Sequence, residues 1–399
     1  MNLDVTDFFK HIVVLVFMSA CSCGTSVRLL ADENAQSQPV LRVVFFTPSD
    51  VDPPEDVAER LKAFVNYAQE FYGNWMEHWG YASENPLPVE LGENGDINVL
   101  FVKGRFDQAS GRYRQLGFQQ EVVEAACEEH DIDPNGQVWW IFTYGGPERR
   151  GFRGGGNAKR GGISTAIYDP TVRKLKIGME LGSDDTPKNS KAAIHELGHA
   201  LGLPHIGPLE NDKLGNSLMG PVVRSFRSRY PEESRAYLTE ASAAMLWKHP
   251  LFSGSTKGRD KSPTLHLADF RVSYDESLDR FVIAGKVVSD EMAHSIVVAN
   301  ESQANRSDYW RKCFVGRMND DATFEVVIDE LDKTDGQLRI VVCFNNGTVA
   351  GRDGVGLQNG FAKQYSFDAT AFAFGEGWSE IESTNKPRGK RPIRRLFRQ

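Results

Sequence analysis

The hydrophobic positions in the first half of the chain follow two periods. Apolar residues recur at helical spacing over 54–79 and 118–130, and this pattern predicts two helices. Short apolar runs between and around them predict strands, at 41–48, 96–104, 138–144, 162–169 and 174–181. Because strands and helices alternate, we expect an α/β layer built on a largely parallel sheet.

The pattern changes in the second half of the chain. Residues 231–249 are rich in helical signals, and the polar stretch 253–263 has the composition of a linker. Beyond it, short segments of alternating apolar and polar residues recur at a spacing of roughly ten residues, with polar turns between them. This spacing favours a β-sandwich.

The first residues have the layout of an export signal. A short apolar run covers 12–20, follows Lys10 and precedes small residues. It is too short to cross a bilayer, which takes about 20 apolar residues. The segment Met18–Cys21 is similar to a bacterial lipoprotein cleavage box, with Cys21 as the lipidated residue, whereas ordinary cleavage near Cys23 and a buried N-terminal strand are the alternatives. We therefore expect a secreted or cell-envelope protein, attached to the membrane through Cys21 in the lipoprotein case.

Composition excludes several classes of protein. The 399 residues are 40% hydrophobic and 25% charged, which excludes a collagen, a coiled coil and a wholly disordered chain. The net charge of −8 is unfavourable for a general nucleic-acid binder, so no nucleic-acid partner is expected. Five cysteines are too few for a disulfide scaffold. Cys313 and Cys343 fall on separate predicted strands, and whether they pair is left open.

The candidate chemistry lies in the segment HELGHALGLPH, which begins at His195. On a helix, His195 and His199 lie one turn apart on the same face, so that their imidazoles can share one metal ion. Glu196 is offset around the helix and can reach a water on the metal without being a ligand. Gly202 can adopt a positive φ and end the helix, which lets the chain return with His205 as the third ligand. Three imidazoles and a water make a catalytic zinc site with an open position.

This motif resembles that of the metzincin clan of zinc metalloproteases, and the resemblance covers roughly residues 40–252. Met219, in the segment NSLMGP, fits the methionine-bearing turn that lies beneath the zinc in this clan. The chain is similar to matrixin-like and pappalysin-like members but fits no single family, because Ile206 follows the third histidine and Pro221 stands where astacins carry tyrosine. The resemblance implies a metzincin-like catalytic domain with a mixed sheet and an active-site helix. It also implies one catalytic Zn²⁺ and is compatible with additional Ca²⁺ sites.

Two upstream features complete the expected site. Thr186 before Pro187 predicts the start of the active-site helix, since a hydroxyl can cap the first turn and proline fits within it. The strand 162–169 precedes this helix, and in this clan an edge strand at that place binds an extended substrate through main-chain hydrogen bonds. We therefore expect 162–169 to line the substrate cleft.

The expected function is that of a zinc metalloendopeptidase acting on a protein or peptide. Zinc-activated water attacks the peptide bond, with Glu196 as the general base and His195, His199 and His205 as the metal ligands. Two alternatives remain: an exported adhesion or binding protein with a structural metal site, and a zinc hydrolase of a non-protein amide such as peptidoglycan.

These observations divide the chain into five parts. They are a signal peptide (1–24), a linker (25–39), a zinc metalloprotease domain (40–254), a β-sandwich domain (263–375) and a basic, disordered tail (376–399).

Overall fold

The computed structural model of the chain describes residues 39–114, 117–134, 136–146, 155–157, 161–171, 173–187, 189–305, 307–351, 360–376 and 379–381. The predicted signal peptide with Cys21 lies outside the described residues, as do nearly all of the linker after it and most of the basic tail. The described residues belong to one compact unit.

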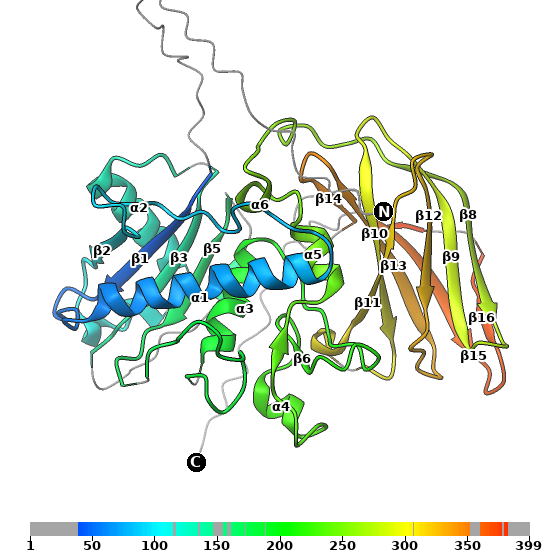
Figure 1. Cartoon of the computed structure of the whole chain (residues 1–399), viewed down its shortest axis with the longest axis horizontal. Helices are drawn as coiled ribbons and strands as arrows, with labels where there is room; N and C mark the ends of the chain where they lie inside the picture. Colours follow the sequence, from blue (N-terminus) through cyan, green and yellow to red (C-terminus); the bar gives the residue numbers. More distant parts are fainter. Residues whose placement is uncertain are drawn as a thin grey trace, which may run out of the picture. The chain divides into compact units, whose positions relative to one another are not determined.

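The N-terminal region, residues 39–254, is built on a five-stranded sheet in the order β2–β1–β3–β5–β4 (Figure 1). The strands are β1 (Leu41–Thr47), β2 (Val99–Lys103), β3 (Val138–Thr143), β4 (Gly155–Asn157) and β5 (Ile163–Ile167). Neighbouring strands are parallel except for β4, which runs antiparallel to β5 at the edge. The prediction of an α/β part with a largely parallel sheet is confirmed.

Helices cover both faces of this sheet. The long helix α1 (Val57–His78) crosses one face, as Figure 1 shows, and α3 (Ser190–Ala200) packs in the same hydrophobic cluster, which includes Val43 of β1. On the other face α2 (Phe118–His130) packs against residues such as Val44 of β1. Adjacent residues of β1 point to opposite faces because side chains alternate along a strand. Both faces are therefore buried, which explains the nearly continuous apolar runs in the sequence.

Short elements connect and complete this region. They are η1 (Gln108–Ser110), η2 (Arg112–Arg114), β6 (Asn216–Ser217), α4 (Val223–Arg227), β7 (Ala236–Tyr237), α5 (Glu240–Leu246) and α6 (Pro250–Ser253). β6 and β7 pair in parallel, and the Ser217 hydroxyl of β6 donates a hydrogen bond to the Ile206 carbonyl in the loop after α3.

The C-terminal two-sheet region, residues 266–381, consists of antiparallel strands. One sheet follows the path β11–β10–β13–β15–β16, with β14 and β17 paired alongside, and the other follows β12–β9–β8. Their bounds are β8 (His266–Asp275), β9 (Arg280–Val288), β10 (Ala293–Ser302), β11 (Lys312–Arg317), β12 (Thr323–Ile328), β13 (Gly336–Phe344), β14 (Val349–Ala350), β15 (Gly360–Phe367), β16 (Phe372–Phe374) and β17 (Ser379–Ile381). Phe281 of β9 and Ile340 of β13 belong to one hydrophobic core, so the two sheets pack against each other. The turn η4 (Asp308–Trp310) lies between β10 and β11.

The two regions also share buried surface. Val297 of β10 and Val341 of β13 belong to the same hydrophobic cluster as α1 and α3. The hydroxyls of Tyr81 and Ser295 lie 3.2 Å apart in this buried contact. The two-sheet region is therefore packed onto the N-terminal region rather than joined to it by the chain alone.

Three expectations about individual elements are wrong. Residues 174–181 form turns and irregular backbone instead of a strand, and Gly178 with φ +82° is incompatible with an extended run. The stretch 231–249, expected to be rich in helix, is helical only in α5, which begins where Thr239 caps it by accepting a hydrogen bond from the Ser242 N–H. The strand 162–169 is not at the sheet edge, since β5 pairs on both sides with β3 and β4.

Cys313 and Cys343 are both buried and do not form a disulfide. They lie on β11 and β13, and β10 runs between these strands. Cys313 pairs with Ala299 of β10 and Cys343 with Ser295, so the two cysteines are also offset along the strands. Two strand spacings alone keep them at least about 9.5 Å apart, whereas the Cα atoms of a disulfide lie within about 7 Å.

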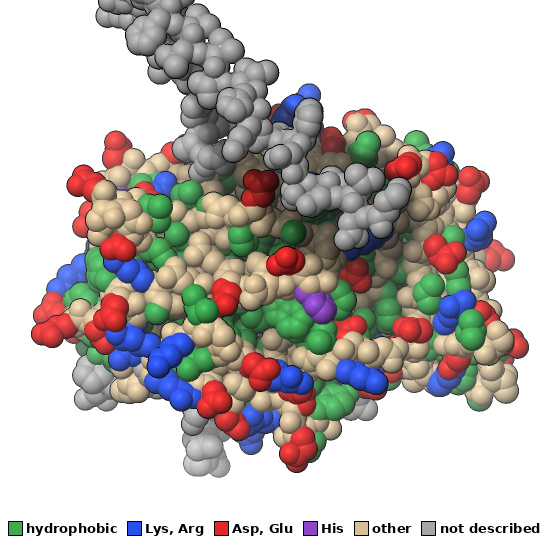
Figure 2. Space-filling view, viewed as in Figure 1, with side chains coloured by type: hydrophobic (Ala, Val, Ile, Leu, Met, Phe, Trp, Pro, Cys, Tyr) green, Lys and Arg blue, Asp and Glu red, His purple; other side chains and the backbone are tan. Residues whose placement is uncertain are grey.

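Acidic and basic side chains are interspersed over the face drawn in Figure 2, and hydrophobic side chains gather below α1. A groove of about 350 Å³ lies there, lined by Tyr67, Phe71 and Trp75 of α1 and by the loop around Met179. Among the described residues, none of the helices has the length and apolarity needed to cross a membrane.

Candidate metal centre

The helix α3 carries the first part of the sequence motif, but it begins later than expected. Its first residue is Ser190, and Asn189 precedes it in the left-handed conformation without a side-chain cap. Thr186 instead stabilises the loop before the helix, because its hydroxyl accepts from the Gly182 N–H and donates to the Ser183 carbonyl. The expectation that Thr186 caps this helix is therefore wrong.

The end of α3 follows the prediction for Gly202, which has φ +92°. The Gly202 N–H donates to the His199 carbonyl and the Leu203 N–H to the Gly198 carbonyl, at 3.0 and 2.8 Å. These two bonds form a Schellman motif, in which a left-handed residue ends the helix and satisfies its last carbonyls. The chain reverses at this point and returns toward the helix with His205.

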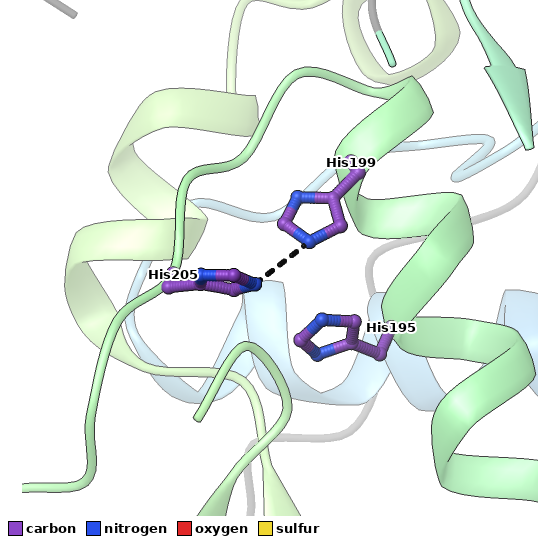
Figure 3. A group of neighbouring side chains, drawn as sticks. All are labelled: His195, His199 and His205. Carbon is purple, nitrogen blue, oxygen red and sulfur yellow. Dashed lines mark hydrogen bonds between the residues drawn. The ribbon is translucent and has the colours of Figure 1, made fainter. Parts of the chain in front are cut away.

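The structure brings His195, His199 and His205 together (Figure 3). Each offers a ring nitrogen, and these nitrogens all lie within 4.8 Å of one another. The Nε2 atoms of His199 and His205 are 3.1 Å apart. Two nitrogens bound to one tetrahedral zinc at about 2.05 Å would lie about 3.3 Å apart, so the spacing suits a shared metal ion.

The second nitrogen of each ring is already engaged. Nδ1 of His195 lies 2.8 Å from the Leu218 carbonyl, and Nδ1 of His199 lies 2.8 Å from the Leu203 carbonyl. A carbonyl only accepts hydrogen bonds, so both Nδ1 atoms carry a proton and both Nε2 atoms present a lone pair when the rings are neutral. Lone pairs that converge in this way repel one another unless a cation lies between them. The donor set therefore fits a metal ion.

Burial controls the charge on the site. It lowers the pKa of His195 to about 3, with smaller contributions from the Lys191 charge and the neighbouring His199, so that this imidazole is neutral and available as a ligand. Burial also raises the pKa of Glu196 to about 7. A carboxyl group in such surroundings can take up and release a proton near neutral pH.

Met219 lies in the core beneath the site and is 1% exposed. A Cβ atom added to Gly198 of α3 would come within 2.5 Å of the Met219 sulfur, so the thioether packs directly against the helix. The Ile206 N–H donates to the Met219 carbonyl at 3.3 Å, and the Ser217 hydroxyl donates to the Ile206 carbonyl at 2.6 Å. These bonds join the segment of Met219 to the loop that carries His205.

Lys191 is a buried residue of this site that the sequence reading missed. Its ammonium group donates to the carbonyls of Leu218 and Pro221 at 3.2 and 2.9 Å and lies 3.5 Å from that of Gly220. Leu218 is also the acceptor of His195, so one carbonyl joins the lysine and the histidine. The signal was present in the sequence, since Lys191 precedes His195 by one helical turn and shares its face.

Two further residues come from the C-terminal two-sheet region. The carboxylate of Asp308 accepts a hydrogen bond from Nδ1 of His205 at 2.8 Å. The ring of Tyr309 stacks on His205, with 3.8 Å between ring centroids and 28° between planes. No sequence signal connects these residues to the motif, because 103 positions separate Asp308 from His205.

Comparison with family models gives no match for this chain, and neither does comparison with curated protein sequences. Solved structures do match. Catalytically inactive OgpA from Akkermansia muciniphila, in complex with an O-glycopeptide substrate (glycodrosocin), superposes with a TM-score of 0.64 at 21% sequence identity, over 87% of this chain and 98% of that chain. The chain has the fold of OgpA.

Two crystal forms of wild-type OgpA give the same result. Both have a TM-score of 0.64 and 22% identity, over 86% of this chain and 98% of that chain in one form and over 88% and 99% in the other. The likeness to OgpA thus covers both the N-terminal region and the two-sheet region. At this level of identity it concerns the fold.

Proposed function

We propose that the protein is a zinc-dependent endopeptidase. The observation that carries this proposal is the convergence of three imidazoles, on His195, His199 and His205, with Glu196 next to the first of them on the same helix. The orientation of two of the rings is set by backbone carbonyls, which leaves Nε2 to face the centre.

Each residue has a defined part in this proposal. His195, His199 and His205 would hold the zinc ion, which when bound would lower the pKa of a water molecule and polarise a carbonyl group. Glu196 accepts the proton of the attacking water and delivers it to the nitrogen of the leaving amine. The burial that raises the pKa of Glu196 makes this proton exchange accessible at neutral pH.

Catalysis is favoured over a purely structural metal site. Among the described residues, the group of close metal-ligating side chains consists of the three histidines. The nearby Asp308 carboxylate is hydrogen-bonded to Nδ1 of His205. It therefore supports a metal ligand instead of filling the fourth coordination position of the metal. Three protein ligands with an open corner are typical of catalytic zinc, whereas structural zinc has four.

The substrate class is proposed from OgpA. Because OgpA binds an O-glycopeptide substrate and shares this fold, we propose O-glycosylated peptides as substrates, with a non-protein amide such as peptidoglycan as the alternative. Export of the protein, attachment through a lipid on Cys21 and calcium binding remain proposals that rest on the sequence.

The proposed role of Glu196 predicts that the variant Glu196→Gln keeps its zinc and loses nearly all turnover. The amide has the shape of the carboxylate but cannot accept the proton, and such general-base losses reduce rates by about 10²–10⁴-fold. Mass spectrometry of an O-glycosylated peptide, with metal content measured on the same sample, provides the test.

Two controls sharpen this experiment. The same peptide without its glycan tests the substrate class, and a chelator-treated sample tests the metal requirement. A Glu196→Gln variant that cleaves as fast as the wild type would refute the mechanism, and cleavage of peptidoglycan alone would refute the peptidase assignment.

A further inference from the structure

We propose that the turn η4 of the C-terminal two-sheet region is part of the metal centre, with Asp308 as the residue that positions His205. This inference rests on the proposed function in that it treats His205 as a ligand. It assigns the two-sheet region a direct role in the site, in addition to any binding role of its own.

His205 depends on this support more than the other two histidines do. His195 and His199 project from a regular helix and are held by carbonyls of Leu218 and Leu203, within the N-terminal region. His205 follows the end of the helix on an irregular loop. Its Nδ1 has Asp308 as its acceptor. A loop residue without this partner could rotate its ring away from the centre.

Asp308 and Tyr309 act on the ring in complementary ways. The carboxylate fixes the proton on Nδ1, which leaves the Nε2 lone pair for the metal, and its charge makes the imidazole a stronger donor. The Tyr309 ring covers one face of His205, and together the two contacts restrict both the tilt and the rotation of the imidazole.

The backbone around η4 is held firmly against the His205 loop. The Gly207 N–H donates to the Arg311 carbonyl at 2.6 Å. A Cβ atom at Gly207 would lie 2.6 Å from the backbone of Trp310, so the two segments touch without room for a side chain. Arg311 is in turn paired with Glu301 of β10 at 3.5 Å, which connects η4 to the sheet behind it. The position of Asp308 is therefore set by the two-sheet region.

The test measures zinc affinity independently of activity. Full-length wild type and the variants Asp308→Ala and Asp308→Asn are titrated against a competing chromophoric chelator. We expect Asp308→Ala to bind zinc 10- to 100-fold more weakly, as is typical when a partner of a metal-bound histidine is removed. Asparagine keeps an oxygen that accepts from Nδ1 but lacks the charge, and we expect a loss of about fivefold.

Asp320→Ala is the matched control, because Asp320 is an exposed aspartate of the same two-sheet region. It should bind zinc as tightly as the wild type. The visible spectrum of the cobalt(II)-substituted proteins reports the coordination geometry, and we expect it to change in Asp308→Ala and not in Asp320→Ala. A loss of packing alone would move the unfolding temperature without changing this spectrum.

The outcomes separate this inference from the proposed function. Equal zinc affinity in Asp308→Ala and Asp320→Ala would overturn the inference even if the wild type cleaves peptides. If Asp308→Ala fails to fold, the test uses Asp308→Asn instead. A zinc affinity equal to that of the wild type in Asp308→Asn would then overturn the inference. Weaker zinc binding in the Asp308 variants, combined with a wild type that cleaves no peptide, would support the positioning role and reject the endopeptidase.

Discussion

At the scale of single residues, Lys191 is the most unusual feature of the site. A lysine is rarely buried without a carboxylate partner. Here the ammonium group is stabilised by backbone carbonyls of the segment 218–221, one of which also orients His195. Lys191 thus connects the segment of Met219 to α3 through hydrogen bonds from its Nζ atom, although burial disfavours the charged form of the side chain.

Burial lowers the pKa of Lys191 to about 7, from 10.5 in an unfolded chain. Between these values the unfolded chain binds a proton that the folded one lacks, so the free energy of unfolding should rise with pH, by up to about 1.4 kcal/mol per pH unit. The variant Lys191→Met should lose this rise. Urea unfolding at pH 7.5 and 9.5 tests it, and an identical increase in both proteins would contradict the prediction.

At the scale of elements, α3 is packed closely on two sides. Gly198 contacts the Met219 sulfur. Gly156 of β4 lies against the Glu196 carbonyl, and a Cβ atom added to Gly156 would come within 2.1 Å of that carbonyl oxygen. Small residues at these two points let the helix sit between the sheet and the segment of Met219. The edge strand β4 therefore packs directly against the part of α3 that carries Glu196 and His199 of the candidate metal centre.

Replacing a glycine inside a helix with alanine normally stabilises the helix by about 1 kcal/mol. At this position we expect the opposite, a loss of about 1–3 kcal/mol, because the new methyl group collides with the buried Met219 side chain. The denaturant midpoint of Gly198→Ala measures this. In a Met219→Ala background the collision is removed, and the same substitution should become neutral or stabilising; a loss of equal size there would exclude Met219 as the cause.

Local patterns in the sequence predicted much of the fold and of the site. The spacing of His195, His199 and His205 placed three ring nitrogens together because helix geometry and Gly202 determine it. The edge strand β4 was missed, since two of its residues are glycines and carry no strand pattern. Asp308 was missed because no local rule relates residues so distant along the chain.

At the scale of the whole molecule, the contact between the two regions contains a histidine that resists protonation. His294 of β10 packs edge-on against Trp247, with 4.9 Å between ring centroids, and its Nδ1 lies 3.0 Å from the Ser295 hydroxyl. Burial lowers its pKa to about 3, with smaller contributions from the charges of Lys248 and Arg317. The contact between the two regions therefore includes an imidazole that stays neutral at ordinary pH.

This arrangement predicts that the folded state loses stability in acid. Between pH 6.5 and about 3, His294 is protonated in the unfolded chain but not in the folded one. The free energy of unfolding should therefore fall as the pH falls, by up to about 1.4 kcal/mol per pH unit. His294→Gln, which cannot be protonated, should lose less stability than the wild type between pH 7 and 5. If both proteins lost the same free energy of unfolding between pH 7 and pH 5, another titrating group would be responsible for the acid sensitivity.

The hydrogen bond between His205 and Asp308 has a consequence for the order in which the protein matures. Ribosomes deliver residue 308 long after residue 205, and the strands that hold η4 on either side must pair before its carboxylate reaches the imidazole. A growing polypeptide would thus carry the HELGHALGLPH helix while its third histidine is still without support. Under the proposed function, a nascent chain that has not yet folded its two-sheet region would lack proteolytic activity, because one of its three metal ligands would still be unsupported.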